Sequence, residues 1–232
     1  MRLNREKRAM STLVDQRTVL LAGATGLVGG LMLQALLADP AVSRVHALSR
    51  RPLTIDHPKL QVHIVDFSRL PALPAADEAY LALGTTIKVA GSQQAFRAVD
   101  LDANLAVARA AFAAGVRRIG LVSAAGADAA SSVFYNRVKG ELEDALEAMG
   151  LTALVIARPS LLLDHRDGLR QPPRIGERIA IPIAKLLAPI LPGTYRPVQA
   201  RAVAQSLVRT VPVAEGVRVL ASDELIRIGA ER

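Results

Sequence analysis

The stretch TVLLAGATGLVGG at residues 18–30 decides the predicted fold of this chain. An apolar, β-branched run leads into three glycines spaced as GxxGxxG, namely Gly23, Gly26 and Gly29, and a run with helical period follows them. Such apolar runs form buried strands, and glycine permits a tight turn directly after one. We therefore predict a strand over 18–22 and a helix over 27–38, which ends at Asp39-Pro40 because proline cannot continue a helix.

The same region admits a second interpretation, because residues 18–38 carry no charged side chain and follow a basic segment at 1–17. An uncharged stretch of this length could be a membrane span or a signal peptide. The spaced glycines and the change of period within the stretch favour strand–turn–helix instead. We expect a cytoplasmic protein with no membrane partner, in which residues 1–16 form a flexible basic arm.

The composition excludes several classes of protein. The 232 residues include no cysteine, no tryptophan and four scattered histidines, and 51% of them are hydrophobic. Such a chain is not disordered, has no disulfide framework or cysteine nucleophile, and is predicted to hold no metal. The net charge of +8 is concentrated at 1–17, 40–51 and 158–178. With few aromatic side chains to stack on bases, we expect no nucleic-acid partner.

Apolar runs and helical-period segments alternate along the rest of the chain, which is typical of a parallel sheet with crossover helices. We predict an α/β Rossmann fold, a doubly wound parallel sheet with helices on both faces, as a single domain over 17–232. A small substrate-covering segment is expected at 164–200. Further strands are predicted over 44–48, 60–65, 79–83, 118–122, 152–157 and 217–221, and further helices over 93–114 and 133–149.

The glycine turn suits a dinucleotide. Glycine lets the backbone approach a pyrophosphate closely, and the helix that follows offers free N–H groups and the positive end of its dipole. A glycine-rich turn without a ligand is the alternative. The predicted cofactor-binding residues of this turn are Gly23, Thr25, Gly26, Leu27, Val28 and Gly29.

The segment after the second strand selects the cofactor. NAD enzymes place an acidic residue there for the ribose 2′-hydroxyl, whereas arginine suits the 2′-phosphate of NADP. Here the segment is Ser49-Arg50-Arg51, without an acid from 40 to 54. We therefore predict a preference for NADP(H); NAD(H), with the arginines as ordinary surface residues, is the alternative. Asp66 and Phe67 follow the third strand, where Asp66 would accept from the adenine amino group or cap the next turn.

Tyr135 and Lys139 lie four residues apart in the helix predicted at 133–149, so they share one face. An ammonium beside a phenol favours the phenolate, which suits the pair to general acid/base chemistry. An exposed tyrosine over a lysine stem is the alternative. Ser123 ends the strand at 118–122, at the edge of the sheet where α/β proteins bind ligands, and its hydroxyl could polarise a substrate carbonyl.

These motifs together resemble the short-chain dehydrogenase/reductase superfamily, and more narrowly its atypical branch that includes the Tat-interacting-protein oxidoreductases. The matching segments are GATGLVGG (23–30), SRRPL (49–53), VDF (65–67), LGTTIKVAGSQQAFRAVDLD (83–102), YNRVKGELE (135–143) and IARPSLLL (156–163). The resemblance implies Tyr135 as acid/base, Lys139 as its partner and Ser123 as the third member of a triad. It also places Gly84 and Thr85 beside the ribose and phosphates, and Pro159 and Ser160 against the nicotinamide.

One departure bears on the function. Family members often carry two serines at the end of the fifth strand, whereas this chain has Ser123-Ala124-Ala125. The first hypothesis is an NADP(H)-dependent oxidoreductase that acts on a small carbonyl or alcohol. The second is an NADP(H)-binding regulatory or redox-sensing protein without turnover, and the third is a sugar-nucleotide epimerase or dehydratase. A small-molecule substrate is expected as partner, with a homodimer or a protein partner as further options.

Overall fold

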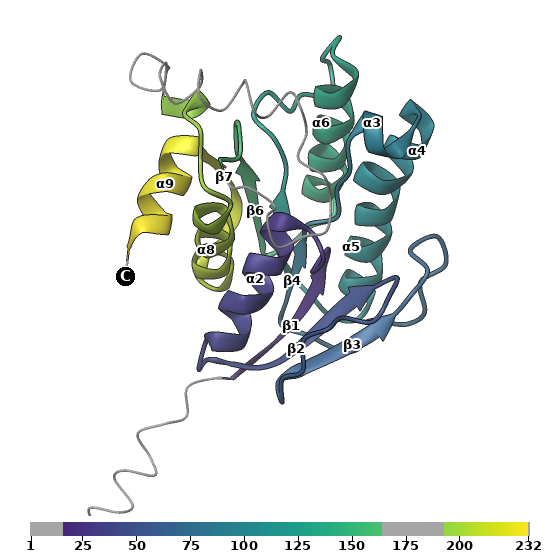
Figure 1. The fold of residues 1–232 in the computed structure, drawn as a ribbon, viewed down its shortest axis with the longest axis vertical. Coiled ribbons are helices and arrows are strands. Elements are labelled where there is room, and N and C mark those ends of the chain that lie inside the picture. Colours follow the sequence, from purple (N-terminus) through teal and green to yellow (C-terminus); the bar gives the residue numbers. More distant parts are fainter. Residues whose placement is uncertain (1–15, 164–192, 232) are drawn as a thin grey trace, which may run out of the picture.

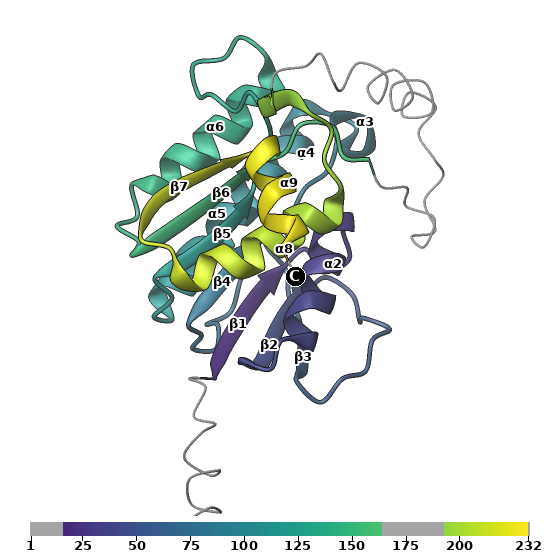
Figure 2. The same cartoon turned by 90° about the vertical axis from the view of Figure 1, so that its left-hand side faces the viewer.

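The computed structural model describes residues 16–163 and 193–231. Within them, seven parallel strands form one sheet in the order β3-β2-β1-β4-β5-β6-β7 (Figures 1 and 2). The strands are β1 (Arg17–Ala22), β2 (Val42–Ser49), β3 (Leu60–Ile64), β4 (Glu78–Leu81), β5 (Arg118–Val122), β6 (Ala153–Arg158) and β7 (Gly216–Ala221). The predicted Rossmann-type α/β fold is therefore confirmed.

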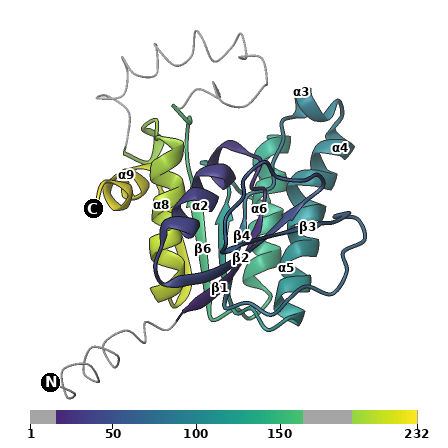
Figure 3. The same ribbon diagram turned by 60° about the horizontal axis from the view of Figure 1, so that its bottom comes forward.

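Helices cover both faces of the sheet, as Figure 3 shows. One face packs against α2 (Leu27–Ala38) and α8 (Ala200–Thr210), with α9 (Ser222–Ala230) beside α8. The other face packs against α5 (Asn104–Ala113) and α6 (Phe134–Glu147). The central strand β1 alternates accordingly, because Val19 and Leu21 enter the first core and Leu20 enters the second. The remaining helical elements are α3 (Ile87–Ala90), α4 (Gln93–Arg97), and the short 3-10 turns Gly193–Tyr195 and Val211–Val213.

The strand order reverses at β1, because the chain moves from β1 to β2 and β3 on one side and to β4, β5 and β6 on the other. Ligands of open α/β sheets bind beyond the carboxyl ends of the strands at such a reversal. The glycine turn follows β1 and therefore lies at this point of the fold.

The helix predicted over 93–114 is interrupted. Between α4 and α5 the chain forms a π-helical segment, Ala98–Ala103. A π turn inserts an extra residue into a helix and rotates the following positions relative to a regular α-helix. A regular helix over 93–114 is predicted to bury one stripe, namely Phe96, Val99, Ala103, Val107 and Ala110. In the structure Phe96, Ala103 and Val107 are buried, Val99 and Ala110 are only half-buried, and Ala108 and Ala111 are buried as well.

The other predicted strands and helices are confirmed to within two residues at each end, including the last strand, β7. In the described ranges, none of the helices combines the length and the apolar character that crossing a membrane requires. The basic arm expected at 1–16 and most of the segment expected at 164–200 lie outside the described residues.

Candidate functional site

The turn between β1 and α2 depends on glycine at two positions. Gly23 has a φ of +97°, and a Cβ atom there would lie 2.3 Å from the Ala82 carbonyl oxygen. A Cβ atom on Gly29 would lie 2.1 Å from the Gly23 carbonyl oxygen. Any larger residue at either position would therefore collide with backbone, and the glycines hold β1, α2 and the end of β4 close together.

The amino terminus of α2 is open to an anion. Gly26 is the N-cap residue, no side chain caps the helix, and its first turn contains no acidic residue. Thr25 is exposed at the tip of the turn, Leu27 is half-buried, and Val28 packs into the core. The free N–H groups and the positive end of the helix dipole fit a pyrophosphate at this position.

The segment Ser49-Arg50-Arg51 follows β2 at the same edge of the sheet, because Leu48 pairs with Ala22 in the register of β1 and β2. The Ser49 hydroxyl is buried and accepts a hydrogen bond from the Arg51 backbone N–H at 3.3 Å. Both arginine side chains are exposed. They are therefore accessible to a phosphate that sits beyond this edge.

Asp66 takes the turn-capping arrangement. Its Oδ1 accepts hydrogen bonds from the Ser68 backbone N–H at 2.9 Å and from the Ser68 hydroxyl at 2.7 Å. These hydrogen bonds lower the pKa of Asp66 below its usual value. The carboxylate is exposed, and the neighbouring Phe67 packs partly against the core.

Tyr135 and Lys139 lie on one face of α6, as predicted. The Tyr135 ring is half-buried and packs against Phe96 with ring centroids 5.6 Å apart. The Lys139 Nζ lies 6.0 Å from the centroid of the Tyr135 ring. A Cβ atom on Gly140 would lie 2.1 Å from the Ala129 backbone nitrogen, so this glycine lets the loop before α6 pack directly on the helix.

Lys139 has a partner that the sequence did not reveal. Its Nζ donates to the Oδ1 of Asp100 at 2.7 Å, and both side chains are at least 95% buried. The Asp100 Oδ2 accepts a hydrogen bond from the Thr85 backbone N–H at 2.8 Å. Asp100 therefore joins α6 to the Gly84-Thr85 loop that follows β4. The structure thus brings together three predicted site residues, namely Lys139, Gly84 and Thr85.

The contacts of Ser123 differ from those of Lys139. The serine is buried, and its hydroxyl donates a short hydrogen bond to Glu143, which also forms an ion pair with Arg158. Glu143 lies two turns beyond Tyr135 on the same face of α6. The arrangement links β5, β6 and α6 and is sufficient to explain a serine at this position. A role for Ser123 toward substrate stays a prediction.

Pro159 and Ser160 follow β6 at the carboxyl edge of the sheet. The Pro159 carbonyl accepts from the Ala125 backbone N–H at 2.9 Å. The Ser160 backbone N–H donates to the Ser222 hydroxyl at 3.0 Å, and the Ser160 hydroxyl donates to the Arg196 carbonyl at 2.6 Å. These bonds fix the segment beside the loop that follows β5.

Sequence reasoning missed Asp100 and Glu143. Glu143 could have been found, since the spacing from Tyr135 through Lys139 to Glu143 places all three on one helix face. Asp100 could not, because its direction depends on the π-helical segment. In the described residues no cluster of three or more metal-ligating side chains occurs.

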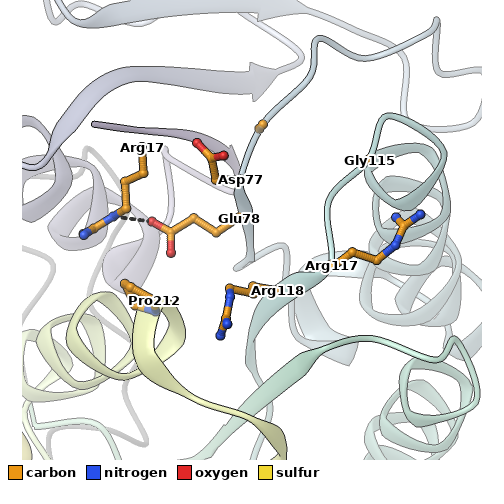
Figure 4. Close-up of a pocket in the computed structure, with 8 residues that line it drawn as sticks. Arg17, Asp77, Glu78, Gly115, Arg117, Arg118 and Pro212 are labelled. Carbon is orange, nitrogen blue, oxygen red and sulfur yellow. Dashed lines mark hydrogen bonds and ion pairs between the residues drawn. The ribbon is translucent and has the colours of Figure 1, made fainter. Parts of the chain in front are cut away.

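A cavity of about 320 Å³ lies at the opposite edge of the sheet, at the amino ends of β1, β4 and β5 (Figure 4). Figure 4 shows Arg17 and Glu78 facing each other there, with the Arg17 Nε donating to Glu78 at 2.6 Å. Burial raises the pKa of Glu78 to about 7, against the opposing effect of Arg17. None of the predicted site residues lines this cavity.

Comparisons with known proteins agree with this geometry. A family model described as NAD(P)H-binding matches residues 23–178. Protein fmp52, mitochondrial, of Aspergillus clavatus is 40% identical over 162 residues, covering 66% of this chain and 69% of that protein. Protein HTATIP2 of Rattus norvegicus is 34% identical over 164 residues, covering 68% of this chain and 67% of that protein.

Solved structures show the same fold. A short chain dehydrogenase family protein from Francisella tularensis has a TM-score of 0.66 at 12% identity, covering 90% of this chain and 98% of that one. MoeE5 in complex with UDP-glucuronic acid and NAD has a TM-score of 0.66 at 18% identity, covering 92% of this chain and 81% of that one. The family match over residues 23–178 shows that the chain belongs to the NAD(P)H-binding family, and it is a relative of the fmp52 and HTATIP2 proteins.

Proposed function

We propose that the protein is an NADP(H)-dependent oxidoreductase that acts on a small carbonyl compound or alcohol. The observation that carries this proposal is the Tyr135–Lys139 pair on one face of α6, joined through Asp100 to the loop after β4. The glycine turn and the open amino terminus of α2 support a dinucleotide beside this pair.

Each side chain has a defined part in this reaction. A bound nicotinamide would supply or accept the hydride. The Tyr135 hydroxyl gives a proton to the carbonyl oxygen during reduction, or takes the proton of the alcohol during oxidation. Lys139 holds a positive charge beside the phenol, which favours the phenolate form.

The catalytic proposal is tested by binding followed by turnover. NADPH is titrated into the protein by fluorescence, and aldehydes and ketones are then screened for loss of NADPH absorbance. We expect Tyr135→Phe to keep the NADPH affinity of the wild type and to lose turnover by about a hundredfold or more, because only the proton donor is removed. Turnover that survives in Tyr135→Phe would contradict the role given to this residue.

The preference for NADP(H) is proposed from Arg50 and Arg51, which are exposed at the same edge as the glycine turn. Replacing both with alanine is expected to weaken NADPH binding by about tenfold to a hundredfold, because a guanidinium–phosphate contact is lost. The affinity for NADH should change little. Arg44→Ala is the matched control, since Arg44 is also exposed on β2 but lies in the first half of the strand. Equal weakening of both cofactors would refute the preference.

A second candidate, an NADP(H)-binding regulatory or redox-sensing protein, is favoured by one observation. The Ser123 hydroxyl is engaged by Glu143, and Ala124 stands where family members often have a second serine. Tight NADPH binding with no turnover over the whole screen, unaffected by Tyr135→Phe, is the outcome that would select this function.

We also propose that the substrate is a small molecule and that the protein is cytoplasmic. A homodimer or a complex with a protein partner is proposed as its assembly. The fungal relatives are named as mitochondrial proteins. Imaging of the tagged full chain tests the location, and light scattering of the purified protein tests the dimer.

A further inference from the structure

We propose that Asp100 is a positioning residue that holds both the Lys139 ammonium and the Thr85 backbone in place for the nicotinamide nucleotide. The inference rests on the proposed function, because it assumes that Lys139 and the Gly84-Thr85 loop face the nucleotide. Beyond that function, the inference assigns the positions of the Lys139 ammonium and of the Gly84-Thr85 loop to one buried carboxylate, that of Asp100.

The two carboxylate oxygens of Asp100 bind different partners. Oδ1 accepts from the Lys139 Nζ at 2.7 Å, and Oδ2 accepts from the Thr85 N–H at 2.8 Å. Both partners are donors only. An ionised carboxylate accepts at both oxygens, whereas an asparagine in the same place would turn its own N–H₂ toward one of the two donors. The position therefore requires an acid.

The position of Asp100 depends on an irregular helical turn. Asp100 lies in the π-helical segment Ala98–Ala103, and π turns are frequent at functional sites. Asn104 closes the widened turn, because its Nδ2 donates to the carbonyl oxygens of Val99 at 3.2 Å and Asp100 at 3.1 Å. The same Nδ2 donates to the Leu83 carbonyl at 3.0 Å, one residue before Gly84.

Asp100 and Asn104 thus attach the helix to the loop after β4 through two independent bonds. The loop lies close to the carboxylate, since a Cβ atom on Gly84 would be 3.5 Å from Oδ1. The Gly84-Thr85 backbone is therefore held by side chains of the π-helical segment and of the first residue of α5.

Asp100 also neutralises the charge of Lys139. Lys139 is buried, and an unpaired ammonium in the protein interior is strongly unfavourable. Asp100 supplies the opposite charge and lets Lys139 remain an ammonium at a fixed position, with its Nζ 6.0 Å from the centroid of the Tyr135 ring. Tyr135 therefore experiences the field of an ion pair, which is weaker than the field of a lone ammonium.

The experiment compares Asp100→Asn with Asp102→Asn. Asp102 lies in the same π-helical segment and its replacement changes the net charge equally, but its side chain is exposed. We expect Asp100→Asn to weaken NADPH by about tenfold to a hundredfold, the range of one lost charge-assisted hydrogen bond, and Asp102→Asn to leave the affinity unchanged. Wild-type affinity in Asp100→Asn would overturn the proposal.

A second readout is independent of cofactor and substrate. The chain has three tyrosines and no tryptophan, so tyrosinate absorbance can be followed against pH without interference from indole. The step assigned to Tyr135 is identified by its absence in Tyr135→Phe. We expect this step to move to lower pH in Asp100→Asn, because the charge of Lys139 is no longer neutralised. A purely structural role would leave the step in place, and that result would refute the coupling.

A further variant covers the case in which Asp100→Asn does not fold. The double change Asp100→Asn with Lys139→Gln removes both buried charges and avoids an unpaired one. If Asp100 acts through Lys139, the double variant binds NADPH as well as Lys139→Gln alone, apart from the contribution of Thr85. Fully additive losses would overturn the proposal. Failure of the wild type to bind NADPH or NADH would refute the proposed function, whereas the tyrosinate readout still tests the coupling.

Discussion

The two edges of the sheet each contain a buried carboxylate paired with a basic side chain, and the difference between the pairs is instructive. At the carboxyl edge, Asp100 binds Lys139, whose Nζ lies 6.0 Å from the centroid of the Tyr135 ring, and the Thr85 backbone in the loop after β4. At the amino edge, Glu78 binds Arg17, which in turn reaches Asp39 at 2.6 Å.

The amino-edge pair lines a cavity, whereas the carboxyl-edge pair lies at the loop after β4, where a Cβ atom on Gly84 would be 3.5 Å from the Asp100 Oδ1. The first joins strand ends to the end of α2, whereas the second joins α6, which carries the proposed acid/base Tyr135, to the loop after β4. The edge that we propose as functional is therefore not the one with this cavity. The proposal rests on the glycine turn and on the partners of Asp100.

The largest effect is expected from a glycine exchange that separates the two edges. Gly29→Ala places a Cβ atom 2.1 Å from the Gly23 carbonyl oxygen, so the turn must open, and we expect NADPH binding to fall by about a hundredfold or more together with a loss of stability of about 3 kcal/mol. Calorimetric titration and thermal unfolding measure the two quantities.

Gly115→Ala is the matched exchange at the amino edge. Gly115 also has a positive φ of +101°, but nothing lies within 4 Å of an added Cβ atom. The free energy of unfolding of Gly115→Ala should be lower by about 1 kcal/mol because of backbone strain, and its NADPH affinity should be unchanged. Equal losses of affinity in the two variants would show that the edges are not functionally distinct.

The second-largest expected effect is a pH dependence of the free energy of unfolding, which arises from Glu78 at the amino edge. Burial raises the pKa of Glu78 to about 7, so between pH 4.5 and 7 the folded state binds more protons than the unfolded state. Stability from this group is therefore lost as the pH rises through 7, by up to about 3 kcal/mol.

Glu78→Gln should abolish this part of the pH dependence, measured as the change in the free energy of unfolding by urea between pH 5 and 8, with NADPH affinity unchanged. The exposed Glu215→Gln serves as the control for a lost negative charge. A pH profile that is identical in Glu78→Gln and the wild type would contradict the assignment.

The smallest effect concerns Ser123. Its hydroxyl is buried against Glu143, which keeps its ion pair with Arg158 when the serine is removed. Ser123→Ala should lower the free energy of unfolding by about 1 kcal/mol and leave NADPH affinity unchanged. If turnover falls by about a hundredfold in a variant that is still folded at the assay temperature, Ser123 acts on substrate as the family resemblance implies.

The sequence was informative wherever a residue type answers a local requirement. Gly23 and Gly29 are such positions, because only glycine tolerates the backbone approach that the turn needs, and the bounds of α2 follow from Gly26 and Asp39-Pro40. The pairing of Tyr135 with Lys139 follows from helical spacing alone.

The remainder depends on contacts between residues that are distant in the chain. Asp100 and Lys139 are separated by 39 positions, and nothing in either local segment selects the other. The Ser123–Glu143–Arg158 contact likewise requires β5, β6 and α6 to be placed first. Periodicity also fails across the π-helical segment, because a template of 3.6 residues per turn cannot register an inserted residue.

Because of that insertion, the number of residues in the helix matters as well as their identity. Each residue of a regular α-helix turns the chain by about 100°, so shortening the segment by one would restore regular winding and swing either Asp100 or Asn104 away from the loop after β4. Every amino acid could remain of an acceptable type and the attachment would still be lost. Scanning by substitution therefore cannot reveal this feature, whereas scanning by single-residue deletion can. Among related proteins, gaps at this point of an alignment would be more informative than mismatches.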